Sequence, residues 1–112
     1  MNFQTTKNAN VAVVKTLVNK LDATNAPELK AELLVLNNSG INQMVIDMVD
    51  TKYCDSSGLS AILTANRLCK DSSGKFVLCG LQTNVQKLIE IAQLDKVLLI
   101  CSDEHSAMEL LK

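Results

Sequence analysis

Residues Gln43–Gly58, QMVIDMVDTKYCDSSG, are the most informative segment for the fold, because they change from a strand pattern to a loop pattern. Its first part, Gln43–Val49, is nearly continuous in apolar and β-branched residues, which predicts a buried strand. Residues 50–58 are polar and predict a loop. Leu59–Lys70 then predicts an amphipathic helix, because apolar residues recur at helical spacing. These apolar positions are Leu59, Ile62, Leu63 and Leu68. A strand, a loop and a helix in this order are typical of an α/β domain.

Further strands and helices are predicted on both sides of this unit. The predicted strands are Phe3–Lys7, Val11–Val18, Gln43–Val49, Lys75–Cys79 and Val97–Cys101. The predicted helices are one that begins within Thr24–Glu28 and ends at Asn37–Gly40, then Leu59–Lys70, Asn84–Ala92, and a last one from its cap Ser102 to Lys112. Apolar strands of this kind need cover on their faces. We therefore predict an α/β fold with a single, mostly parallel sheet of four to five strands and about four helices.

Length and composition exclude several classes of protein. A chain of 112 residues predicts a single domain over residues 1–112. The net charge is −1 and Arg67 is the only arginine, which argues against direct nucleic-acid binding. With only one histidine, His105, one chain cannot form a multi-histidine metal site.

The chain carries no recognisable targeting sequence. Residues 1–10 are polar and lack the apolar core of a signal peptide. No run approaches the roughly 20 apolar residues that span a bilayer. The four cysteines form no C-x-x-C pair, so neither zinc binding nor a redox motif is indicated. We therefore expect a cytoplasmic protein with free thiols and no membrane insertion.

The loop Asp55-Ser56-Ser57-Gly58 is the candidate functional site. Loops at the carboxyl ends of strands carry the sites of open α/β sheets. Ser56 or Ser57 is predicted to be the cap or the first residue of the following helix. Its hydroxyl would lie beside free backbone N–H groups and the positive end of the helix dipole, which favours a phosphoryl group. A simpler interpretation, a serine N-cap followed by a turn glycine, remains open at this point.

The same loop also carries a family resemblance. Asp55-Ser56-Ser57-Gly58-Leu59 after Val45–Met48 resembles the signature of STAS domains, in particular of bacterial anti-sigma factor antagonists. Other segments resemble that family in the same order, over essentially the whole chain. They are Leu21-Asp22, Ala26–Leu29, Gly74–Leu78, Val85–Leu88 and Leu94–Val97.

The resemblance implies a binding switch rather than an enzyme. In that family an unphosphorylated antagonist binds an anti-sigma factor, itself a serine kinase, and so frees a sigma factor. The kinase phosphorylates the antagonist, and a phosphatase removes the phosphate. Carried over, Ser56 is the phospho-acceptor and Gly58 allows a tight turn at the helix start. The phosphorylation loop and partner interface would comprise Asp22, Asp55, Ser57, Gly58 and Leu59. No catalytic residue, cofactor or metal is implied.

Three alternative functions remain open from the sequence. An enzyme could use Ser56 as a nucleophile with His105 as its base, or pair Asp47 with Asp55 for acid–base or magnesium chemistry. Asp47 lies within a predicted strand, and we expect its carboxylate to form a hydrogen bond in a cap or a loop instead. A stand-alone STAS module could dock on a transporter ATPase or a signalling assembly without phosphorylation. A small-molecule-binding module is the third alternative, and this short chain would give it only a small cavity.

Overall fold

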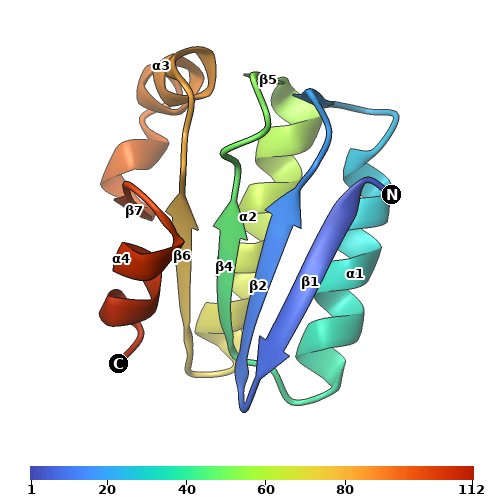
Figure 1. The fold of residues 1–112 in the computed structure, drawn as a ribbon, viewed down its shortest axis with the longest axis vertical. Coiled ribbons are helices and arrows are strands. Elements are labelled where there is room, and N and C mark those ends of the chain that lie inside the picture. Colours follow the sequence, from blue (N-terminus) through green and yellow to red (C-terminus); the bar gives the residue numbers. More distant parts are fainter.

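A five-stranded sheet runs through the computed structural model, which describes residues 1–112 (Figure 1). Its strands are β1 (Phe3–Asn8), β2 (Val11–Thr16), β4 (Gln43–Asp47), β6 (Lys75–Cys79) and β7 (Leu99–Cys101). Their order across the sheet is β1-β2-β4-β6-β7. Strand β1 is antiparallel to β2, and all the other neighbours are parallel. The predicted α/β class with a mostly parallel sheet is confirmed.

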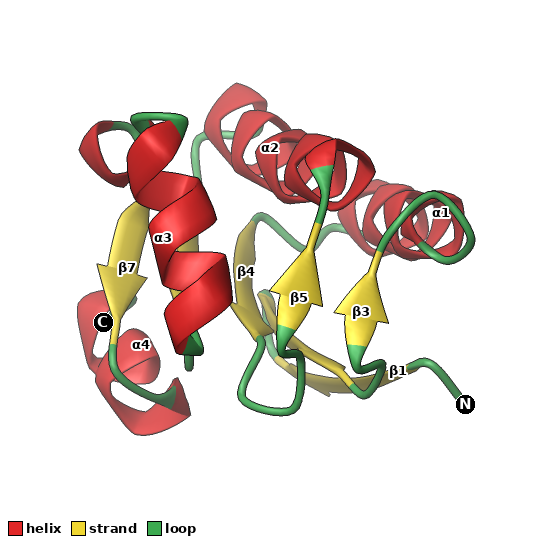
Figure 2. Ribbon diagram, turned by 90° about the horizontal axis from the view of Figure 1, so that it is seen from above, coloured by secondary structure: helices red, strands yellow, loops and turns green.

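Helices cover both faces of this sheet. They are α1 (Ala26–Asn38), α2 (Ser56–Asp71), α3 (Thr83–Ile91), the 3-10 turn η1 (Leu94–Lys96) and α4 (Glu104–Leu110). Helices α1 and α2 lie side by side on one face, and α4 lies on the other (Figure 2). Because β2, β4 and β6 are buried on both faces, their sequences are nearly continuous apolar runs. None of the helices has both the length and the apolar character needed to cross a membrane.

Two apolar cores result from this arrangement. The larger core lies between the sheet and helices α1, α2 and α3, and the smaller one lies under α4. Leu33, Ile46 and Ile62 are fully buried in the larger core, and Val45 and Val77 are fully buried in the smaller one. The central strand β4 therefore contributes alternate side chains to the two cores, as the strand geometry requires.

Several strands are shorter than the apolar runs predicted. Strand β2 ends at Thr16 and β4 at Asp47, while β7 begins only at Leu99. Some apolar residues beyond these ends are still buried: Met48 is fully buried and donates its N–H to Cys79 O at 3.0 Å, whereas Val49 and Val97 are exposed. An apolar run therefore indicates a core strand but does not mark where that strand ends.

The last helix begins differently from the prediction. Ser102 is not its cap. The N-cap of α4 is Asp103, whose Oδ1 accepts a hydrogen bond from Ser106 N at 2.8 Å. Both residue types are favourable caps, so the sequence alone could not decide between neighbours.

A second, two-stranded sheet was not predicted at all. Strand β3 (Lys20–Leu21) pairs in parallel with β5 (Tyr53–Cys54) beyond the carboxyl edge of the main sheet (Figure 2). Beneath it the hydroxyls of Thr16 and Thr51 lie 2.6 Å apart, and Thr51 Oγ1 donates to Val18 O at 2.7 Å. These contacts are buried or partly buried, so they fix the segment that leads into α2.

Candidate functional site

Asp55 is the N-cap of α2. Its Oδ1 accepts hydrogen bonds from Ser57 N at 2.9 Å and from Gly58 N at 3.1 Å. Ser56 is the first residue of the helix, which is one of the two positions predicted for it. Its side chain is exposed and its hydroxyl makes no hydrogen bond within the protein. The simpler interpretation of a serine cap therefore does not apply to Ser56, because Asp55 is the N-cap of the helix.

The start of α2 offers fewer free amide groups than the sequence suggested. The N–H groups of Ser57 and Gly58 are already bound to Asp55, and Leu59 N–H begins the helical hydrogen bonds by donating to Asp55 O at 3.0 Å. Ser56 N–H is the remaining amide of the first turn without a partner in the protein. A phosphoryl group on Ser56 would thus share the helix start with the Asp55 carboxylate.

Gly58 is required for close packing rather than for a turn. It lies inside α2, and it is not one of the two glycines with a positive φ, which are Gly40 and Gly80. A Cβ at Gly58 would lie 2.7 Å from Leu21 O and would collide with Cys54 Sγ. The expected tight turn is therefore wrong, and the start of α2 rests directly on β3 and β5.

Cys54 is half-buried beneath this contact. Its Sγ donates to Asp55 O at 3.5 Å. Burial, followed by the negative charge of Asp55, raises the pKa of the Cys54 thiol to about 12. Very little thiolate therefore exists near neutral pH, and Cys54 is a packing residue.

The neighbouring loop brings Asp22 towards the helix start. Asp55 N donates to Leu21 O at 3.2 Å, which joins the two loops. The Asp22 carboxylate is engaged in its own turn, where Oδ1 accepts from Thr24 Oγ1 at 2.6 Å and from Thr24 N at 2.9 Å. These hydrogen bonds lower the pKa of Asp22 below its ordinary value. Asp22 therefore shapes the loop beside the site.

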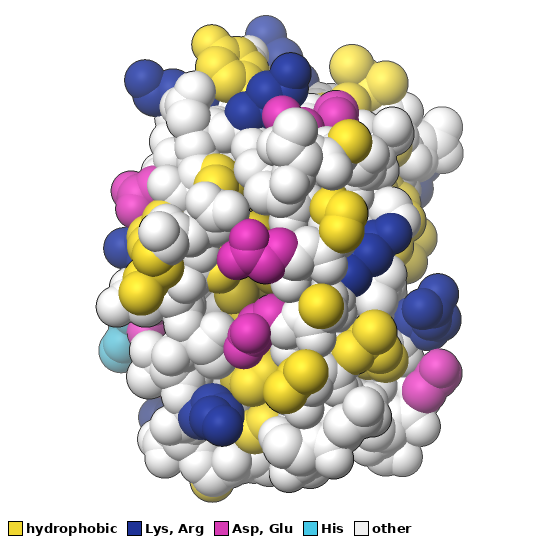
Figure 3. All heavy atoms as spheres, turned by 90° about the vertical axis from the view of Figure 1, so that its right-hand side faces the viewer, with side chains coloured by type: hydrophobic (Ala, Val, Ile, Leu, Met, Phe, Trp, Pro, Cys, Tyr) yellow, Lys and Arg dark blue, Asp and Glu magenta, His cyan; other side chains and the backbone are white.

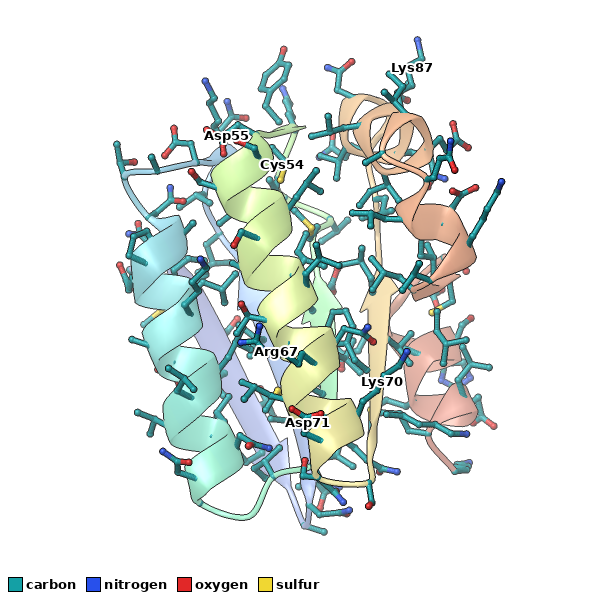
Figure 4. All side chains as sticks on the ribbon, turned by 180° about the vertical axis from the view of Figure 1, so that it is seen from behind. Cys54, Asp55, Arg67, Lys70, Asp71 and Lys87 are labelled. Carbon is teal, nitrogen blue, oxygen red and sulfur yellow. The ribbon has the colours of Figure 1, made fainter.

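The apolar face of α2 is only partly the predicted one. Its buried residues are Gly58, Ala61, Ile62, Ala65 and Cys69. Small side chains let α2 pack closely on α1 and the sheet, which leaves Leu59 half-buried and Leu63 exposed. Figure 4 shows this helix from its outer side, with Asp55 at its start and Arg67 near its middle.

Two open hollows meet at Ser56. One, of about 290 Å³, is lined by Ala23, Ala26, Pro27, Lys30, Ser56, Ser57 and Ser60. The other, of about 440 Å³, is lined by Ser56, Leu59, Ser60, Leu63, Thr64, Arg67, Ala92 and Leu94. Lys30, Ser60 and Arg67 were not predicted. Only the packing of α1 against α2 makes Lys30 a neighbour of Ser56. Ser60 and Arg67 lie on the same helix as Ser56, and the helical spacing of four residues could have identified Ser60.

The residues considered for catalysis are not assembled around Ser56. His105 is exposed on α4, on the opposite face of the sheet from α2 (Figure 2). Asp47 is buried and its Oδ1 accepts from Val49 N at 3.1 Å, which is the hydrogen-bonding role predicted for it. No group of three or more His, Cys, Asp or Glu side chains is arranged to hold a metal ion.

The charges on the surface are mixed. Figure 3 shows the side that carries α1 and β1, where acidic, basic and apolar side chains are interspersed. This face lacks the continuous basic surface on which phosphate backbones bind.

Comparisons of the sequence identify a family. Residues 2–107 match the family model of the STAS domain. A Bordetella bronchiseptica protein named as an anti-sigma factor antagonist, BtrV, is 25% identical over 95 residues, which span 85% of this chain and 82% of that protein. The anti-sigma-B factor antagonist of Listeria monocytogenes is 29% identical over 79 residues, which span 70% of this chain and 69% of that protein.

Comparisons of the structure find the same fold. A Thermotoga maritima protein described as an anti-sigma factor antagonist has a TM-score of 0.87 at 24% identity, over 97% of this chain and 93% of that one. The anti-sigma factor antagonist SpoIIAA in its unphosphorylated form has a TM-score of 0.83 at 16% identity, over 96% and 95% of the two chains. Bacillus SpoIIAA in its phosphorylated form has a TM-score of 0.76 at 17% identity, over 98% and 99%.

Proposed function

The chain belongs to the STAS domain family, and from that premise we propose that it is an anti-sigma factor antagonist controlled by phosphorylation of Ser56. In this proposal the protein is a single domain in the cytoplasm. Its unphosphorylated form binds an anti-sigma factor that is also a serine kinase. The kinase transfers the γ-phosphoryl group of ATP to Ser56 Oγ, with loss of the hydroxyl proton and release of ADP. A phosphatase then hydrolyses the phosphoserine and restores binding.

The position of the Ser56 hydroxyl carries this proposal. It is exposed at the first residue of α2 and has no hydrogen-bond partner in the protein. Asp55 holds the helix start instead, through Ser57 N and Gly58 N. A kinase can therefore reach Ser56 Oγ without breaking a contact that stabilises the fold.

Electrostatics explains why a phosphate would end the binding of a partner. Phosphorylation adds about −1.5 to −2 charges and three acceptor oxygens. At roughly 5 Å and an effective dielectric constant of about 20, each like-charge pair costs about 3 kcal/mol before screening. In the free protein, water solvates the exposed group. A partner packed on this loop removes that water, and a few kcal/mol lowers affinity by about a hundredfold or more.

Relatives support the proposal. Two of the similar proteins are named as anti-sigma factor antagonists, and one antagonist of this fold, SpoIIAA, has been solved in both unphosphorylated and phosphorylated forms. Asp22 and Leu59 fit the same proposal as parts of the partner interface, since Asp22 lies in the adjoining loop and Leu59 lines a hollow that Ser56 also lines.

Phosphorylation with a candidate anti-sigma factor kinase tests the proposal. The chain is incubated with ATP and kinase, and the modified residue is located by tandem mass spectrometry. We expect one phosphate on Ser56, its loss in Ser56→Ala, and its retention in Ser60→Ala, the matched variant of another exposed serine one turn later. A phosphate elsewhere, or none with any kinase of this class, contradicts the proposal.

Kinase binding and thermal stability, measured on the same variant, separate the proposed switch from a structural role for Ser56 and from docking without phosphorylation. Ser56→Glu should weaken kinase binding by about a hundredfold and leave the melting temperature nearly unchanged. If both fall together, Ser56 is a structural residue. If Ser56→Glu leaves binding intact, the docking of an unphosphorylated module on a transporter ATPase or a signalling assembly is the better interpretation.

A further inference from the structure

Lys30 is the only cationic side chain in the smaller hollow beside Ser56. It extends from α1 and takes part in no ion pair, since the two ion pairs of the protein join Lys15 to Asp50 and Lys112 to Glu109. The acids of its own helix bind other groups. Glu28 accepts from Asn2 Nδ2 at 3.0 Å, and Glu32 accepts from Thr5 Oγ1 at 3.4 Å. The Lys30 ammonium is therefore free.

The other polar groups of this hollow are also free. Ser56, Ser57 and Ser60 come from the first turns of α2, and none of their hydroxyls has a hydrogen-bond partner in the protein. The Ser56 N–H is unpartnered as well. One ammonium, three hydroxyls and one amide thus line or adjoin the same hollow, and all of them can donate hydrogen bonds to an anion.

We propose that Lys30 is the cation that binds the phosphoryl group of phosphorylated Ser56. The proposal rests on the proposed function, because it needs a phosphate on Ser56 Oγ. Ser56 and Lys30 line the same hollow, so the phosphate binds between α1 and α2. The hydroxyls of Ser57 and Ser60 donate to its remaining oxygens.

Lys30 also balances the charge around the modified loop. The Asp55 carboxylate is next to Ser56 and repels the phosphate, and Asp22 lies in the adjoining loop. Lys30, which lines the same hollow as Ser56, offsets part of this repulsion. A hydrogen bond between its ammonium and the phosphate is charge-assisted and therefore stronger than a neutral one. The phosphorylated state therefore keeps its fold, and the phosphate is drawn towards α1.

The experiment uses the full chain with phosphoserine placed at position 56 during synthesis, so no kinase is needed. Phosphorus NMR follows the second ionisation of the phosphate against pH. In the free protein the phosphate is exposed to water, so the dielectric constant between it and a cation roughly 5 Å away is taken as about 80. Lys30 then stabilises the dianion, and Lys30→Gln should raise the pKa of the phosphoserine by roughly 0.5. Lys30→Arg should restore the wild-type titration, because it keeps the charge.

Lys70→Gln is the matched control. Lys70 is exposed at the far end of α2 from Asp55 (Figure 4), so its loss should leave the titration unchanged. The proposal is overturned if Lys30→Gln titrates like the wild type, or if Lys70→Gln moves the titration equally. Because the phosphate is built in, this outcome is independent of the kinase assay. Failure of that assay rejects the proposed function, and failure of this one rejects only Lys30.

Discussion

Replacing Asp55, the N-cap of α2, should lower the free energy of unfolding by an amount that the structure allows us to work out. Asp55→Ala removes the acceptor of two hydrogen bonds, from Ser57 N at 2.9 Å and Gly58 N at 3.1 Å. Loss of an N-cap costs about 0.5–2 kcal/mol. Gly58 is buried, so water cannot fully replace its lost partner, and an unsatisfied buried donor costs about 1–3 kcal/mol. We therefore expect a loss of about 2 kcal/mol.

Two further variants isolate the source of this loss. Asp55→Asn keeps an acceptor oxygen and loses only the charge, so it should cost about 0.5 kcal/mol through the weaker interaction with the helix dipole. Asp103→Ala is the matched control on α4, where the cap accepts one exposed hydrogen bond, from Ser106 N at 2.8 Å. Its removal should cost about 0.5–1 kcal/mol.

Urea unfolding followed by far-UV circular dichroism measures all three free energies of unfolding. The expected order of loss is Asp55→Ala, then Asp103→Ala, then Asp55→Asn. If Asp55→Ala costs no more than Asp103→Ala, then the second hydrogen bond and the burial of Gly58 contribute nothing, and the account of the helix start is wrong. If Asp55→Asn costs as much as Asp55→Ala, the charge and not the acceptor oxygen holds the helix start.

Two other predictions concern the same segment. Gly58→Ala should lower the free energy of unfolding by about 1–3 kcal/mol, because the new Cβ would lie 2.7 Å from the backbone oxygen of Leu21. Adding Cys54→Ala removes only the sulfur collision, so thermal melting should show partial recovery; full recovery would mean that the Leu21 contact is unimportant. The thiols of Cys54, Cys69 and Cys79 should react slowly with Ellman's reagent at pH 8 in the native state and rapidly in urea, because burial raises the pKa of Cys54 and of Cys79 to about 12 and that of Cys69 to about 11. Fast native labelling of Cys54 would contradict its assignment as a packing residue.

Much of the fold follows from local patterns in the sequence. Apolar runs and helical periodicity predicted the five strands of the main sheet and the four helices, because burial on two faces or on one stripe constrains residue types directly. The polar stretch before the helix predicted Ser56 or Ser57 at its start, and in the structure Ser56 is the first residue. The order of these segments and the Asp55–Leu59 signature were enough to indicate the STAS family, which the family match confirms.

Tertiary contacts decided the features that local patterns cannot encode. A two-residue pairing such as β3 with β5 carries no periodicity, so the sequence could not predict it. Whether Asp55 or a serine caps α2 depends on where the β5 segment places the backbone. Gly58 resembles a turn residue in the sequence, yet its role comes from Leu21 on a distant strand.

The same distinction applies to the switch itself. Local patterns predicted that Ser56 or Ser57 lies at the start of the helix, because caps and periodicity are properties of neighbouring residues. The packing of the folded chain shows that Ser56 is exposed, that Asp55 leaves its hydroxyl free, and that Lys30 of α1 lines the hollow beside it. Those neighbours meet because α1 and α2 pack side by side on the sheet, and that contact joins residues far apart in the chain.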